Sequence, residues 1–302
     1  MSKGVKYKNE KRLEILKTYK IYIGGKFPRT ESGRYYNPLD SKGNILGNIC
    51  LSSRKDFRNA VVAARSASVG WSARTAFNRS QILYRLGEIL EGRRAQFIEE
   101  LKIQGSTSAK AEKEVNNSID RLIYYAGWCD KYQQIFSSVN PVSSSYYNFS
   151  VCEPMGVVAI IAPEENSLIG LVSVIAPVVA GGNTCVVLAS ESKPLCSVTF
   201  AEVINSSDVP GGVINILTGN AKELAGHFSS HMDVNAIIYS RTDKEELKNI
   251  QINASENMKR VFYWKSDWFS VKAQNPYKIR DLQEIKTTWH PIEQIGGAGS
   301  GY

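Results

Sequence analysis

Cysteine and histidine are scarce in this sequence of 302 residues, and neither is arranged as metal ligands usually are. The cysteines form no C-x-x-C pair and no regular spacing, so we expect reduced thiols buried in a core. Of the three histidines, His227 and His231 stand four residues apart, but HFSSH lacks the glutamate of an H-E-x-x-H zinc motif. The sequence therefore predicts no metal site. The five cysteines are Cys50, Cys129, Cys152, Cys185 and Cys196.

Long apolar runs are also missing. No run approaches the roughly 20 apolar residues that a membrane-spanning helix needs. The first twenty residues, MSKGVKYKNEKRLEILKTYK, are rich in charge and lack the apolar stretch of a signal peptide. We therefore expect a cytoplasmic protein with no membrane partner.

The basic residues are numerous but are not gathered into a patch. The net charge is +8, yet lysine and arginine are mixed with glutamate along the predicted helices, as in EILEGRRAQFIEELK. Nucleic-acid binding usually needs basic residues on one face together with a recognisable motif. The sequence predicts a solvated basic surface and no nucleic-acid partner, and binding to nucleic acid or a membrane surface is the weakest hypothesis.

Glycine-rich phosphate loops are absent from the places where they would act. No G-x-G-x-x-G follows a predicted strand, and no G-x-S-x-G elbow occurs. The terminal GGAGSGY follows no strand and opens no helix, so we interpret 295–302 as a flexible tail.

Helical periodicity dominates the first part of the chain. After a hairpin signal at 19–29, the pattern predicts a serine-capped helix within 52–71 and two helices within 78–106, separated at Gly92. A long helix is expected over 111–136, followed by a turn-rich stretch with the strand-like run YYNFSV.

Strands and helices alternate strictly after Val157. Continuous apolar runs such as VVAIIAP are typical of strands buried on both faces. Alternation of this kind predicts an α/β fold, a doubly wound parallel sheet of the nucleotide-binding type. The four predicted strands are VVAIIAP, TCVVLAS, VINILTG and VNAIIYS, and a fifth, RVFYW, follows an amphipathic helix.

Several of these segments together resemble the aldehyde dehydrogenase superfamily over about residues 19–261. The segments that carry the resemblance are YIGGKF, NPLD, CEPMGVVAIIAP, IAPVVAGGNTCVV, VPGGVINILTG and SSHMDVNAIIYS. The resemblance implies chemistry in which a cysteine thiolate attacks an aldehyde, hydride passes to NAD(P), and a glutamate base activates water. A side-chain amide would help to hold the oxyanion.

The resemblance assigns three residues to cofactor binding, and it shows that other cofactor-binding residues of the family are replaced in this sequence. Pro163, Glu191 and Gly212 match cofactor-facing positions, whereas the lysine that contacts the adenosine ribose is replaced by Leu188. The family's glycine-bearing pyrophosphate loop becomes RTDKEE at 241–246. Arg241 could bind phosphate by charge, but Asp243, Glu245 and Glu246 argue against it.

The catalytic positions do not survive the same comparison. Glu165 stands where the oxyanion asparagine belongs, although a one-residue slip would bring Asn166 there. The general-base glutamate falls on Trp264, whose indole accepts no proton near neutral pH. Cys196, the last cysteine, precedes the position of the family's nucleophile. We therefore predict no catalytic residue and a missing catalytic domain.

The C-terminal part resembles the family's interface strand through EIKTT at 284–288. We expect the strands in SSSYYNFSV and LQEIKTT to pair across subunits, giving a homo- or hetero-oligomer with aldehyde dehydrogenase subunits. The expected parts are a basic lead-in at 1–18, a helical part at 19–136, an oligomerisation hairpin at 137–153, a Rossmann-like cofactor fold at 154–270 and an oligomerisation strand at 271–294.

The whole pattern most resembles the cysteine-less second repeat of the aldehyde dehydrogenase 16 family. Our leading hypothesis is a non-catalytic pseudoenzyme that acts through assembly with itself or with a catalytic repeat. The alternative is an NAD(P)-dependent oxidoreductase acting on aldehydes, or a nucleotide-binding sensor that keeps the cofactor fold.

Overall fold

A sheet of five parallel strands forms the centre of the molecule. The computed structural model describes residues 15–40 and 42–292. The strand order is β10-β9-β6-β7-β8. The first strand in sequence, β6, is therefore central, with β7 and β8 added on one side and β9 and β10 on the other. This confirms the α/β fold with a parallel sheet that the alternating pattern predicts. The strands are β6 (Val157–Ile161), β7 (Thr184–Leu188), β8 (Ile214–Leu217), β9 (Ala236–Tyr239) and β10 (Arg260–Tyr263).

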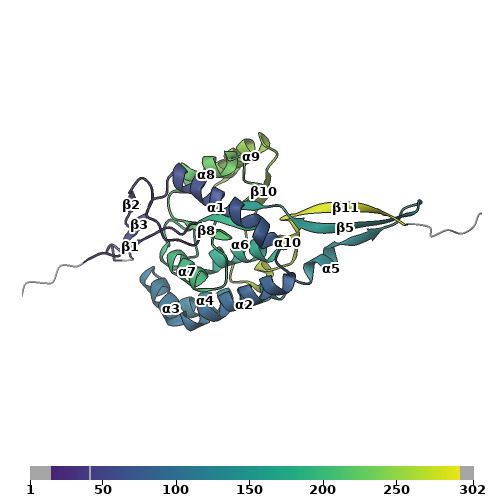
Figure 1. The fold of residues 1–302 in the computed structure, drawn as a ribbon. Coiled ribbons are helices and arrows are strands. Elements are labelled where there is room, and N and C mark those ends of the chain that lie inside the picture. Colours follow the sequence, from purple (N-terminus) through teal and green to yellow (C-terminus); the bar gives the residue numbers. More distant parts are fainter. Residues whose placement is uncertain (1–14, 41, 293–302) are drawn as a thin grey trace, which may run out of the picture.

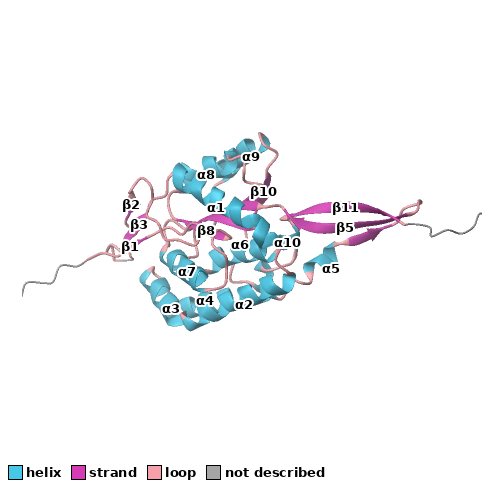
Figure 2. Cartoon of the chain, viewed as in Figure 1, coloured by secondary structure: helices cyan, strands magenta, loops and turns pink. Residues whose placement is uncertain are grey.

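Helices cover both faces of this sheet (Figures 1 and 2). Alternate residues of β6 point to opposite sides, so Val158 and Ile160 belong to one apolar cluster and Ala159 and Ile161 to another. The first face is covered by α6 (Ile169–Ala180) and α7 (Leu195–Ser206), with α2 (Ala76–Gly92), α3 (Arg94–Ile103) and α4 (Ser108–Ala126) beyond them. The second face is covered by α1 (Arg54–Ser72), α8 (Ala221–Ser230) and α9 (Lys244–Ser255).

Helix boundaries follow local signals in the sequence. Ser53 caps α1 in a reciprocal capping box with Asp56, as the serine-capped pattern predicts. The expected break near Gly92 separates α2 from α3. The single long helix expected over 111–136 is a wrong prediction: α4 ends at Ala126, Gly127 is its C-cap, and a turn leads into the short α5 (Tyr132–Phe136).

A three-stranded antiparallel sheet projects from the body, and we call it the strand arm (Figure 1). It consists of β4 (Ser138–Asn140), β5 (Tyr146–Pro154) and β11 (Gln283–Pro291). β11 pairs with β5 along its whole length within one chain. The expectation that these two strands pair with each other across subunits is therefore corrected. An intrachain partner nine residues long satisfies one edge of β11 and leaves the other edge free among the described residues.

The remaining described elements are short. β1 (Thr18–Tyr19), β2 (Tyr35–Tyr36) and β3 (Asn48–Cys50) form a small sheet, and the expected hairpin turn falls at Gly24 and Gly25, which both have positive φ. The 3₁₀ helix η1 (Val271–Ala273) and α10 (Tyr277–Arg280) lead into β11. No described helix is both long and apolar enough to cross a membrane. The tail at 295–302 and most of the lead-in lie outside the described residues.

Candidate functional site

The carboxyl ends of the parallel strands form one crevice, which we call the carboxyl-end crevice. In sheets of this kind ligands bind where the strand order reverses. Here the reversal lies between β6 and β9, which are neighbours in the sheet although β6 is the first of its five strands and β9 the fourth. Glu164 follows β6 and Arg241 follows β9, so both side chains emerge at this point.

Arg241 spans the ends of three neighbouring strands. Its Nη2 lies 3.0 Å from Glu164 Oε2, and the Arg241 side chain is only 11% exposed. Its Nε donates to the carbonyl of Ala162 after β6 at 3.1 Å, and its Nη2 donates to the carbonyl of Ala189 after β7, also at 3.1 Å. The Nε and Nη2 groups of the guanidinium are therefore engaged by the protein itself.

Glu164 occupies the hydrogen-bond donors of the loop that follows β7. Its carboxylate accepts from the backbone N–H of Glu191 at 3.2 Å and of Ser192 at 2.7 Å, and from the hydroxyl of Ser190 at 3.2 Å. Burial alone would raise the pKa of Glu164, but the Arg241 guanidinium and these backbone bonds outweigh it and hold the pKa below its usual value. Backbone N–H groups at such loops are the donors that phosphates use, and here a carboxylate of the same chain takes them.

Two of the three predicted cofactor residues lie at this crevice. Pro163 is buried beside Gly170, and Glu191 lines the crevice with its carboxylate accepting from the side-chain amide of Asn220 at 3.1 Å. Gly212 does not join them, because it precedes β8 and therefore lies at the opposite, amino edge of the sheet. At φ +94° an added Cβ there would come within 2.6 Å of the Ala63 carbonyl, so this glycine serves the packing of α1.

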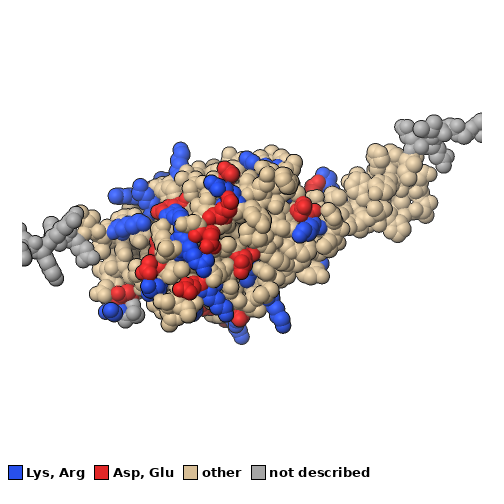
Figure 3. All heavy atoms as spheres, turned by 90° about the horizontal axis from the view of Figure 1, so that it is seen from below, with Lys and Arg blue, Asp and Glu red and all other residues tan. Residues whose placement is uncertain are grey.

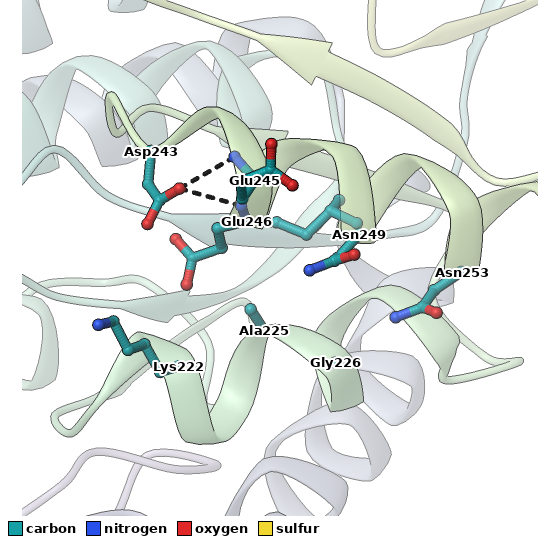
Figure 4. A pocket seen from close by; sticks show the side chains of 9 residues that line it. Lys222, Ala225, Gly226, Asp243, Glu245, Glu246, Asn249 and Asn253 are labelled. Carbon is teal, nitrogen blue, oxygen red and sulfur yellow. Dashed lines mark hydrogen bonds between the residues drawn. The ribbon is translucent and has the colours of Figure 1, made fainter.

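Three linked hollows run along the crevice, with volumes of about 230, 290 and 340 Å³. The first two share Thr242, and the last two share Lys222, Asp243 and Glu246. The largest lies between α8 and α9, where Asp243 caps α9 through the N–H groups of Glu245 and Glu246 (Figure 4).

The lining of the three hollows is acidic, although the chain as a whole carries +8. Seven carboxylates face only three cations, a formal balance of −4. Such a lining repels an anionic ligand. The carboxylates belong to Glu164, Glu165, Glu191, Asp243, Glu245, Glu246 and Asp267, and the cations to Lys222, Arg241 and Lys265.

The sequence model of the aldehyde dehydrogenase family matches residues 28–263 of this chain. The chain belongs to the aldehyde dehydrogenase family.

Related proteins and structures agree with this assignment. The cytosolic 10-formyltetrahydrofolate dehydrogenase of Mus musculus is 30% identical over 262 residues, which cover 83% of this chain and 28% of that protein. DhaS of Bacillus subtilis (strain 168) is 31% identical over 262 residues, 83% of this chain and 51% of DhaS. The NAD+ complex of an aldehyde dehydrogenase from Bacillus cereus superposes with a TM-score of 0.78 at 25% identity, over 83% of this chain and 51% of that one. This aldehyde dehydrogenase-family chain thus spans about half, or less, of the length of these relatives.

NAD(P), the cofactor that this family fold implies, does not fit the residues at the crevice. A dinucleotide pyrophosphate needs free backbone donors at the strand ends, and Glu164 already binds those of Glu191 and Ser192. Arg241 is held by Glu164 and two carbonyls, and the ammonium of Lys193, next to Ser192 in that loop, donates to the Glu165 carbonyl at 2.9 Å. The acidic lining adds a further penalty for phosphate.

The end of β10 holds a tryptophan where the family resemblance places a general base. Trp264 is 7% exposed, and its backbone N–H donates to Tyr239 at 3.0 Å. The ammonium of Lys278 lies 5.0 Å from the centre of its ring and 4.8 Å from that of Trp268. The indole is thus part of the core, and it cannot act as the general base that the resemblance places there.

The thiols of this chain are buried away from solvent. All five cysteines of the chain are buried and free, and burial raises the pKa of Cys129 to about 12 and that of Cys196 well above its usual value. Within residues 15–40 and 42–292, no three His, Cys, Asp or Glu side chains group closely enough to hold a metal ion.

The two candidate positions for the oxyanion amide lie side by side. Glu165 and Asn166 both line the 230 Å³ hollow, beside Ser240.

The sequence reasoning missed Glu164 and undervalued Arg241. Both follow directly after buried strands, and both carry charges that are out of place next to apolar runs. Carboxyl ends of neighbouring parallel strands meet at one edge of the sheet. That rule, applied to Glu164 and Arg241 together, would have predicted the ion pair.

Proposed function

We propose that this chain is a non-catalytic aldehyde dehydrogenase-like protein, a pseudoenzyme that acts through assembly with itself or with a catalytic aldehyde dehydrogenase subunit or repeat. Its functional counterpart in this proposal is the cysteine-less second repeat of the aldehyde dehydrogenase 16 family. The observation that carries the proposal is the ion pair of Glu164 and Arg241 at the crevice. The pair uses the donors and the cation that a dinucleotide would need.

The surface of the strand arm supports a role in assembly. Residues 137–152 contain no charged side chain, in a chain that is 22% charged. Figure 3 shows the same contrast, since charged atoms cover the body but leave the outer arm nearly bare. Val139 and Tyr147 are 63% and 46% exposed and line a shallow hollow of about 350 Å³ with Phe149. Interface cores are poor in charge and rich in aromatic residues, as this surface is.

The test combines nucleotide binding with sedimentation. We expect calorimetric titration of NAD+ and NADP+ into the purified chain to give no saturable heat at millimolar nucleotide, and aldehydes to produce no NADH. Analytical ultracentrifugation should detect a species larger than the monomer at micromolar concentration, alone or with a catalytic aldehyde dehydrogenase.

The nucleotide titration also distinguishes the pseudoenzyme from the alternative functions, a nucleotide sensor or an oxidoreductase. Saturable binding of either nucleotide would contradict the proposal that Glu164 and Arg241 exclude a dinucleotide from the crevice, and it would favour a nucleotide sensor. Turnover of an aldehyde with stoichiometric NADH release would favour the oxidoreductase and end the pseudoenzyme proposal.

A further inference from the structure

A separate hollow, of about 490 Å³, lies between α1 and α8, and we call it the α1–α8 hollow. It shares no lining residue with the three hollows of the carboxyl-end crevice. Its lining holds two guanidiniums, two imidazoles, one hydroxyl and one aromatic ring, and no carboxylate. The residues are Arg54, Phe57, Arg58, His227, Ser230 and His231.

Arg54 and Arg58 have no counter-charge in the described parts of the chain. They stand four residues apart, which places them on the same side of α1. Eight other arginines form ion pairs with carboxylates, but within residues 15–40 and 42–292 neither of these two side chains makes an ion pair or a hydrogen bond. The nearest carboxylate in sequence, Asp56, is buried and accepts from the N–H groups of Ser53 and Glu31. The two guanidinium forks are therefore available to a ligand.

His231 is held in place as a hydrogen-bond donor. Its Nδ1 accepts from the backbone N–H of Asp233 at 3.2 Å, so the neutral ring carries its hydrogen on Nε2. The ring stands edge-on to Phe57, with centroids 5.7 Å apart, and Phe57 is stacked on Phe228 at 4.1 Å. Burial lowers the pKa of His231, and Lys259 and Arg58 lower it further against the opposing effect of Asp233. The imidazole is thus a neutral donor held in place beside two guanidinium cations.

We infer that the α1–α8 hollow binds a phosphate group, with Arg54 and Arg58 as its charged ligands and Ser230 and His231 as hydrogen-bond donors. Arginine forks match the geometry of phosphate oxygens and bind two of them at once. A guanidinium pair in a hollow whose lining holds no carboxylate favours a dianion over a neutral ligand. The phosphate could belong to a soluble phosphorylated metabolite or to a phosphorylated lipid headgroup.

Calorimetry with inorganic phosphate on the whole chain tests this site. The double variant R54Q/R58Q removes both guanidiniums from exposed helix positions, so the fold should be unaffected. The double variant K244Q/K248Q removes the same charge at the same spacing from α9 and is the matched control. We expect saturable phosphate binding that weakens at least about tenfold in R54Q/R58Q and stays unchanged in K244Q/K248Q. No saturable binding by the native chain, or equal weakening in both variants, would overturn the proposal.

A second experiment, with lipid vesicles, distinguishes a soluble phosphorylated ligand from a phosphorylated lipid headgroup. Phosphatidylcholine vesicles with and without phosphatidylinositol phosphate are sedimented with the native chain and with both variants. Arg54- and Arg58-dependent cosedimentation that needs the phosphorylated lipid assigns the site to a headgroup. Phosphate binding without cosedimentation assigns it to a soluble ligand. Neither result depends on the carboxyl-end crevice, so this proposal and the pseudoenzyme proposal fail separately.

Discussion

The guanidinium of Arg241 lies 3.0 Å from the carboxylate of Glu164 at the point where the order of the parallel strands reverses. In a nucleotide-binding fold this is the position of the ligand. Here the protein itself supplies both charges. The Glu164 carboxylate also accepts hydrogen bonds from two backbone N–H groups of the loop after β7. The fold of an aldehyde dehydrogenase cofactor domain is therefore kept while its ligand position is filled from within.

Arg241→Ala should lower the free energy of unfolding by about 1–3 kcal/mol, because it leaves the Glu164 carboxylate partly buried without its cation. The partial exposure of Glu164, 33%, keeps this below the cost of breaking a fully buried pair. Urea denaturation measures the change. Lys55→Ala is the control, since its ion pair with Glu31 is exposed on both sides and should contribute less than about 1 kcal/mol. Equal losses in both variants would contradict a structural role for the pair.

The fold was largely predictable because it rests on local patterns. The apolar runs of β6 to β9 and the serine cap of α1 are visible in short windows of sequence, and the structure confirms them. Gly127, which ends α4, lies inside a periodic stretch, so the pattern alone extended that helix too far.

The site was less predictable because it depends on contacts between distant segments. Glu164 and Arg241 become neighbours only through the pairing of β6 with β9. The partner of β11 depends in the same way on the register with β5, which a strand-like sequence does not specify. Matching single positions to a family motif also misplaced Gly212, since both edges of the sheet carry glycines.

Lys278→Met should change how stability depends on pH. Burial between Trp264 and Trp268, together with the charge of Arg121 and against the opposing effect of Asp281, lowers the pKa of Lys278 from 10.5 to about 7. Between these two values the unfolded chain binds more protons than the folded one, so the stability of the native protein rises with pH through this window. The methionine variant lacks this titration.

The native protein should therefore gain on the order of 1–3 kcal/mol relative to Lys278→Met between about pH 7 and pH 10. Denaturant unfolding at each pH measures this difference. Lys244→Met on the exposed side of α9 is the control and should keep the native pH profile. Parallel curves for the native protein and Lys278→Met would show that Lys278 is protonated alike in both states.

The thiols should be inert in the folded protein. All five cysteines are buried, and burial raises the pKa of Cys129, Cys152, Cys185 and Cys196, so little thiolate is present at neutral pH. A thiol-reactive chromogenic reagent should label none of them rapidly in the native state and all five after unfolding. Ser72→Cys, at an exposed helix end, provides the fast-reacting reference. A native cysteine that reacts as fast as this reference would restore a candidate nucleophile.

Val139→Ser combined with Tyr147→Ser should dissociate the assembly that we propose for the strand arm. Both side chains are exposed on the apolar surface around Phe149, and burying such a surface against a partner is worth roughly 25 cal/mol per Å² of apolar area. Sedimentation velocity should then show monomers, while circular dichroism stays native because neither side chain contributes to the buried core. Val69→Ser combined with Phe77→Ser removes apolar side chains that are even more exposed, from α1 and α2, and should leave the assembly intact. If the native chain is already monomeric at micromolar concentration and binds no aldehyde dehydrogenase subunit, the arm has no partner and the role in assembly is excluded.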